Sequence, residues 1–145
     1  PGANSIALNR ISGSATQFNG ELKANGQVWL VNQKGFVFGD KAEVNVGALV
    51  VSTAGIPNAE GAGFMTNTAS GAQSYQFTQN DAAAKDVRVV LNKSDQFEAK
   101  DGKYIAILAP TVEINDTHVQ ASGGQIGIGA GGNKFTVAID PVGDG

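Results

Sequence analysis

Apolar and polar residues follow one another in short runs along most of this chain, and turn residues separate the runs. Runs rich in β-branched and aromatic residues, bounded by Gly, Asn, Asp or Ser, are typical of β-strands. We predict strands over Val28–Val31, Phe36–Phe38, Leu49–Val51, Val87–Leu91, Tyr104–Leu108, Gln125–Ile128 and Phe135–Ile139. The best helical candidate is one short turn, Asn80–Lys85, capped by Asn80 or Asp81. The pattern therefore indicates an all-β chain.

The strand pattern repeats with a period of 22 residues. The segment that begins at Leu22 matches the one at Val44, and the segment that begins at Phe97 matches the one at Val119. A fixed period of this size indicates stacked repeats, but it is too short for a propeller blade of about 40 residues. The L-x-x-L-x-L pattern and the helical half of a leucine-rich repeat are also missing. A parallel β-helix, a solenoid with coils of about 22 residues, fits the period best.

Inward-pointing residues of successive coils stack on one another in a β-helix, so equivalent positions match in character. Three such columns can be read from the sequence: Leu22, Val44, Phe97 and Val119; Val28, Leu49, Tyr104 or Ile105, and Ile126; and Ala24, Val46, Ala99 and Ala121. The segment Ala54–Ser74 breaks the rhythm, and 53 residues separate the two repeat pairs. We therefore predict a β excursion outside the helix around residues 54–78.

Composition narrows the classes of function. A chain of 145 residues forms one domain, here 1–145, with a sizeable core. The net charge of −3 and the scattered Lys and Arg argue against nucleic-acid binding, which needs a basic face. No apolar run approaches the roughly 20 residues of a membrane-spanning helix. The absence of Cys fits either a reducing cytosol or an exported chain that must not form disulfides before it crosses a membrane.

Candidate chemical motifs are weak. Gly127–Gly132 matches G-x-G-x-x-G, but a strand follows where a dinucleotide site needs a helix. His118 is the only histidine, and its flank is typical of a surface turn. No calcium loop and no nucleophile elbow occur. We predict no catalytic, cofactor or metal site. A polysaccharide-degrading β-helix enzyme is the least favoured alternative, because it needs clustered carboxylates or an arginine in a groove.

An ordered series of segments is similar to a known family. The segments are Leu8–Gly13, Gly20–Asn32, Gly35–Gly39, Val46–Thr53, Gly102–Glu113, Ala121–Gly131 and Gly143–Gly145. Together they resemble the secretion domain of two-partner-secretion exoproteins, the filamentous-haemagglutinin-type N-terminal domain. The resemblance covers nearly the whole chain apart from Ala54–Lys85.

The resemblance implies a right-handed parallel β-helix with flanking strands. It also implies a targeting module at the front of a large secreted exoprotein of the adhesin, haemolysin or toxin-delivery type. Soluble polypeptide-transport domains of a cognate outer-membrane transporter bind such modules in the periplasm, and the exoprotein is exported through the barrel to the cell surface or the medium. No enzymatic activity and no cofactor are expected.

The similarity is densest over Asn25–Gly39. The expected partner-recognition residues are Asn25, Gly26, Asn32, Gln33, Lys34 and Gly35. The family often has an Asn-Pro-Asn-Gly turn, which corresponds here to Asn32-Gln33-Lys34-Gly35, so Gln33 and Lys34 depart from the pattern. The N-terminal cap segment of the family is not found. An uncapped first coil would expose strand edges and favour self-association.

The second hypothesis is a surface adhesion module that binds host glycan or protein directly. It would need exposed aromatic side chains, for which Trp29, Tyr75 and Phe77 are the candidates. Trp29 alternates with Val28 and points to the other face of its strand. There it either anchors a partner or packs beneath the excursion at Ala54–Ser74, which is the interpretation that we favour.

Overall fold

The computed structural model of the chain describes residues 5–56, 73–78, 87–93, 96–100, 103–130 and 134–139, and every regular element within these ranges is a strand. The strands are β1 (Ile6–Arg10), β2 (Thr16–Phe18), β3 (Glu21–Lys23), β4 (Gln27–Val31), β5 (Phe36–Phe38), β6 (Glu43–Val46), β7 (Ala48–Ser52), β8 (Gln73–Thr78), β9 (Arg88–Asn92), β10 (Gln96–Ala99), β11 (Tyr104–Ala109), β12 (Thr111–Asn115), β13 (Val119–Ala121), β14 (Gln125–Ala130) and β15 (Lys134–Ile139). The predicted helical turn at Asn80–Lys85 lies outside the described residues.

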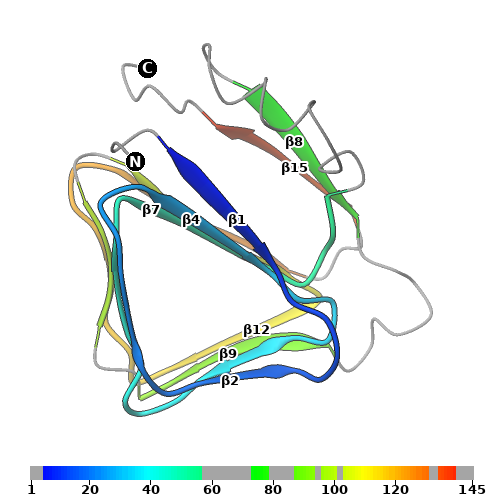
Figure 1. The fold of residues 1–145 in the computed structure, drawn as a ribbon. Coiled ribbons are helices and arrows are strands. Elements are labelled where there is room, and N and C mark those ends of the chain that lie inside the picture. The colour runs from blue at the N-terminus through cyan, green and yellow to red at the C-terminus, as the bar shows by residue number, and fades with distance from the viewer. Residues whose placement is uncertain are drawn as a thin grey trace.

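Three parallel sheets form the sides of a triangular tube, which Figure 1 shows in cross-section. We name them sheet A (β1-β4-β7-β11-β14), sheet B (β2-β5-β9-β12) and sheet C (β3-β6-β10-β13). Each coil adds one strand to each sheet in turn, and β14 lies beyond the fourth complete coil. The prediction of a parallel β-helix is therefore confirmed.

The strand register confirms the predicted columns. Leu22 pairs with Val44, and Phe97 pairs with both Val44 and Val119. Val44 pairs directly with Phe97, although 53 residues separate the two positions in the sequence. The residues in excess of one 22-residue coil therefore lie outside the stacked sheets. Ile105, and not Tyr104, aligns with Leu49 and Ile126. The narrow third column is confirmed where Ala99 pairs with Val46 and Ala121.

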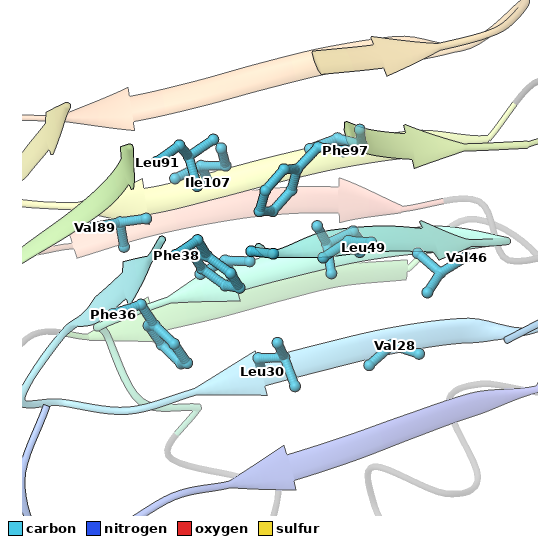
Figure 2. Packing of buried hydrophobic residues seen from close by; sticks show 14 of the residues in the cluster. Val28, Leu30, Phe36, Phe38, Val46, Leu49, Val89, Leu91, Phe97 and Ile107 are labelled. Carbon is cyan, nitrogen blue, oxygen red and sulfur yellow. The ribbon is translucent and has the colours of Figure 1, made fainter. Parts of the chain in front are cut away.

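Alternate residues of the coil strands fill the tube with apolar side chains (Figure 2). The largest of them surround Phe38, which is fully buried. The ring of Phe38 lies 5.5 Å from that of Phe18 and 5.0 Å from that of Phe97, which meets it edge to face. Such pairs add to the stabilisation that burial alone provides. The solenoid therefore has an aromatic centre where the neighbouring strands β2 and β5 of sheet B meet β10 of sheet C.

The three central strands of sheet A, β4, β7 and β11, are covered on both faces. On the outer face of the sheet, Trp29, Val50 and Leu108 form a second apolar cluster. Phe77 of β8 belongs to the same cluster. Strand β8 lies outside the triangle beside sheet A and pairs antiparallel with β15 (Figure 1). The predicted excursion is confirmed in its described part, 54–56 and 73–78. The strand predicted at Phe135–Ile139 is also confirmed, but it belongs to this outer pair and not to a coil.

Candidate recognition site

The turn between β4 and β5 is built around the amide of Asn32. This side chain is buried, donates hydrogen bonds to the Ser14 carbonyl (2.9 Å) and Thr16 Oγ1 (2.8 Å), and accepts one from the Lys34 backbone N–H (2.9 Å). The Gly35 N–H donates to the Asn32 carbonyl at 3.0 Å. Asn32 therefore closes its own turn and ties it to the turn of the preceding coil.

Gly35 is required by both conformation and space. Its φ of 103° lies in a region that side chains with a Cβ disfavour. A Cβ at this position would also lie 2.6 Å from the Arg88 carbonyl oxygen of the next coil. The two positions that this chain shares with the family turn, Asn32 and Gly35, therefore serve the packing of coils in the folded domain.

Gln33 and Lys34, the two residues that depart from the family pattern, are the exposed part of this turn. Gln33 lies next to the base of the excursion, because a Cβ on Gly55 would come within 2.9 Å of Gln33 Nε2. Gly55 in turn exchanges two backbone hydrogen bonds with Thr78 of β8, at 2.9 and 2.8 Å. A fixed turn thus presents one amide and one ammonium group to solvent.

Asn25 and Gly26 occupy a different corner of the solenoid. They precede β4, whereas the Asn32–Gly35 turn follows it, so the length of one five-residue strand separates the two groups, roughly 16 Å. Asn25 is exposed, and the buried Gly26 accepts a hydrogen bond from the Gly47 N–H at 2.8 Å. The structure therefore brings four of the six expected recognition residues together and places the other two elsewhere.

The aromatic patch of the adhesion hypothesis does not exist as proposed. Trp29 and Phe77 are fully buried between sheet A and β8, with ring centroids 6.0 Å apart. Trp29 does point away from the tube, but the excursion covers it, as the favoured interpretation required. The side chain of Tyr75 lies outside the described part of the chain.

A polar contact beneath β8 was not foreseen from the sequence. Trp29 Nε1 donates to the Tyr104 hydroxyl (3.1 Å), which donates to Gln27 Oε1 (2.6 Å). Gln27 and Trp29 come from β4 and Tyr104 from β11, so this contact links two strands on either side of β7. The only feature of the sequence that could have indicated this contact is that Gln27, Trp29 and Tyr104 lie at positions on the same face of sheet A.

We predict that Tyr104→Phe lowers the free energy of unfolding by about 1–3 kcal/mol, because two part-buried hydrogen bonds are lost. Urea unfolding followed by the fluorescence of Trp29, the only tryptophan, measures the loss directly. The control is Gln120→Ala, whose hydrogen bonds to His118 and Ser122 are exposed and whose effect should stay within about 0.5 kcal/mol. An unchanged midpoint for Tyr104→Phe would contradict a stabilising role for the contact.

Two groups of charged side chains form exposed ion pairs on the outer faces. Arg88 donates to Glu113 at 2.8 Å on sheet B, and Lys23 contacts Glu21 and Glu43 on sheet C. The hydrogen bond to Glu21 raises the pKa of Lys23, against a smaller lowering by desolvation. Exposed pairs of this kind contribute little to stability. Among the described residues, no group of three or more His, Asp or Glu is placed to hold a metal ion.

Comparison with known proteins places the chain in a family. The model of the TPS secretion domain matches residues 1–145. A heme/hemopexin-binding protein of Haemophilus influenzae strain Rd is 46% identical over 54 residues, which are 37% of this chain and 6% of that protein. A second Haemophilus influenzae protein of the same name is 35% identical over 80 residues, 54% of this chain and 8% of its own length. The chain therefore corresponds to less than a tenth of these relatives.

Within the described ranges, no helix has the length and apolar character needed to cross a membrane. The fold, with its three parallel sheets and extra-helical strands, agrees with what the resemblance implied. Because the family model matches every residue from 1 to 145, this chain belongs to the TPS secretion domain family.

Proposed function

We propose that this domain is the targeting module by which a larger exoprotein is bound in the periplasm and exported to the cell surface or the medium. The binding partner is the soluble polypeptide-transport part of a cognate outer-membrane transporter. The role is non-enzymatic. The observation that carries the proposal is the match to the TPS secretion domain over the whole chain.

The folded and unfolded chain would offer the transporter different surfaces. In the folded domain, β4 pairs with β1 and β7, and β5 pairs with β2 and β9. An extended partner strand therefore cannot add to the backbone of Asn25–Gly39 unless the coils are apart. Strand addition, in which main-chain hydrogen bonds give affinity and side-chain pockets give specificity, belongs to the unfolded chain.

Recognition of the folded domain would depend instead on exposed side chains. Gln33 and Lys34 are suited to it, because Asn32 and Gly35 hold their turn in one conformation. A preorganised loop loses less conformational entropy on binding than a mobile one. We propose that Gln33 and Lys34 contact the transporter in the folded state, and that Asn32 and Gly35 act through the fold.

The activity of the complete exoprotein is a separate proposal. The two relatives are named heme/hemopexin-binding proteins, so capture of heme or hemopexin by the remainder of the exoprotein is one candidate. Adhesion, haemolysis and toxin delivery are the alternatives that the family resemblance implies. Direct adhesion by this domain has lost its main support, because Trp29 and Phe77 are buried.

The test compares a turn variant with a matched surface variant. We expect Gln33→Ala with Lys34→Glu to leave the unfolding midpoint unchanged and to weaken binding of the folded domain to the transporter's soluble domains by roughly tenfold, as loss of an interface hot spot does. The control, Gln17→Ala with Lys100→Glu, changes the same residue types at other exposed positions and should bind normally. Binding is measured by titration calorimetry with folded and with urea-unfolded domain.

Two outcomes would count against the proposal. Unchanged binding and export of the turn variant would exclude Gln33 and Lys34 as contacts in the folded state while leaving the targeting role intact. Failure of both folded and unfolded domain to bind the transporter, together with failure to direct export of a fused passenger, would overturn the targeting role itself.

A further inference from the structure

Strands β8 and β15 are bound by backbone hydrogen bonds to each other and not to the strands of the coils. They pair from Lys134 opposite Thr78 to Ile139 opposite Gln73, and both lie outside the triangle of sheets A, B and C (Figure 1). Within the described ranges, the backbone of this outer pair is linked to the solenoid through the bridge between Gly55 and Thr78. Movement of the pair away from sheet A therefore breaks no hydrogen bond between the strands of the three coil sheets.

Apolar packing holds β8 against the outer face of sheet A. Phe77 of β8 is fully buried in the cluster that contains Trp29, Val50 and Leu108 of the sheet. Its ring centroid lies 6.0 Å from that of Trp29. An aromatic side chain buries more apolar area than any other kind, so one such contact dominates a small interface. The attachment of β8 in the described residues thus depends mainly on Phe77.

The outer face of sheet A keeps its own order when β8 is away. Trp29 Nε1 donates to the Tyr104 hydroxyl at 3.1 Å, and that hydroxyl donates to Gln27 Oε1 at 2.6 Å. All three residues belong to sheet A, so these two hydrogen bonds persist without β8. Val50 and Leu108 are fixed in the same way by the pairing of β7 with β4 and β11. The surface beneath β8 is therefore built by the coils alone.

The connection from sheet A to the outer pair changes at Gly55. Before it, the chain is fastened to the solenoid, where the Thr53 N–H donates to the Leu108 carbonyl at 3.0 Å. The Ser52 hydroxyl donates to the Ala54 carbonyl at 2.8 Å and accepts from the Ala54 N–H at 3.0 Å. Gly55 exchanges its two backbone hydrogen bonds with the end of β8 instead. The fixed coil and the outer pair thus meet at a glycine, the residue with the widest choice of backbone conformations.

We propose that β8 and β15 form a cover that opens away from sheet A while the coils remain folded. Opening turns the chain at Gly55, withdraws Phe77 and exposes Trp29 to solvent. An isolated pair of strands is at best marginally stable in water, so β8 and β15 lose their pairing when they leave sheet A. Because β15 is the last of the described strands, the cover closes only when the whole domain is present. This opening is independent of how the transporter recognises the domain.

Hydrogen exchange of the 145-residue domain tests whether the cover opens separately from the coils. We expect the paired amides of β8 and β15 to share one degree of protection, roughly 100-fold below that of β4, β7 and β11. Phe77→Ala removes the main contact of the cover and should accelerate exchange in β8 and β15 by roughly 100-fold or more. Equal protection of the outer pair and of sheet A in the unmodified domain would show that they unfold together, and it would overturn the proposal.

The fluorescence of Trp29, the only tryptophan, provides a second readout. In the unmodified domain we expect weak quenching by acrylamide, because Trp29 is fully buried. Two variants should open the cover by different routes. Phe77→Ala removes its packing, and Thr136→Pro, in the middle of β15, disrupts its strand pairing. Both should raise the quenching of Trp29 toward that of the urea-unfolded chain, while circular dichroism and cooperative urea unfolding show that the coils are intact.

Phe38→Ala is the matched control, because it removes the same side chain from inside the tube and leaves the cover in place. It should weaken the coils without raising the quenching of Trp29 in the folded domain. If Phe77→Ala and Thr136→Pro abolish the circular dichroism of the coils, the coils need the cover to fold. If Trp29 stays shielded in both variants, the outer pair is not what covers it. Either result would overturn the proposal.

Discussion

Phe38→Ala is expected to lower the free energy of unfolding by about 3–5 kcal/mol, the upper range for a core substitution. Phe38 is fully buried, and its ring contacts those of Phe18, Phe36 and Phe97 from three different coils. Its removal leaves a cavity that the hydrogen-bonded strands around it cannot close. Urea unfolding, followed by Trp29 fluorescence and by circular dichroism, measures the change.

Two controls separate the cavity from simple loss of an aromatic ring. Phe38→Leu keeps most of the volume and should cost less than Phe38→Ala, about 1.5 kcal/mol or slightly more. Phe18→Ala removes a ring from the first coil, where the side chain is only half-buried, and should also cost less. A loss below about 1.5 kcal/mol for Phe38→Ala would mean that the coils relax around the site more readily than a close-packed core does.

Gly35→Ala is expected to lower the free energy of unfolding by about 2–4 kcal/mol. Backbone strain at positive φ and overpacking by the added Cβ both contribute to this loss. Its Cβ would lie 2.6 Å from the Arg88 carbonyl oxygen, which belongs to the backbone of the next coil. Backbone atoms cannot rotate away as the end of a side chain can. Thermal and urea unfolding of the purified variant give the loss.

Two other glycines serve as controls that separate the backbone strain from the steric collision. Gly13 has a similar φ of 107°, but a Cβ there would meet nothing within 4 Å, so Gly13→Ala should cost only the conformational strain, about 1–2 kcal/mol. Gly20 has open space and no positive φ, so Gly20→Ala should cause no loss. Equal losses at Gly13 and Gly35 would show that the collision with Arg88 is relieved by movement of the coil.

The sequence predicted the architecture because a β-helix repeats its physical requirements in every coil. Leu22, Val44 and Phe97 differ in size but meet the same need for an apolar inward group, and their pairing was confirmed. Strands such as β2 and β3 were not predicted, because each has three residues and one large apolar side chain. Their conformation depends on pairing with β5 and β6, which local propensity does not express.

The sequence could not foresee contacts between distant segments or the role of each turn residue. β15 was predicted as a strand, but nothing near Phe135 indicates that its partner is β8. The role of Asn32 in partner recognition stays a prediction, and the three hydrogen bonds that its side chain makes within the folded domain could not be predicted. An exposed asparagine and a buried turn asparagine have the same sequence signature, because both occur beside glycine in short polar segments.

The two-sided burial of sheet A has a consequence for the chain before it folds. All five residues of β4 and all five of β7 are buried, so Gln-Val-Trp-Leu-Val and Ala-Leu-Val-Val-Ser are nearly continuous apolar segments without a charge. Short uncharged segments of high β-propensity associate between molecules when they are exposed. An extended form of this chain therefore carries two aggregation-prone segments, which only folding or a bound partner covers.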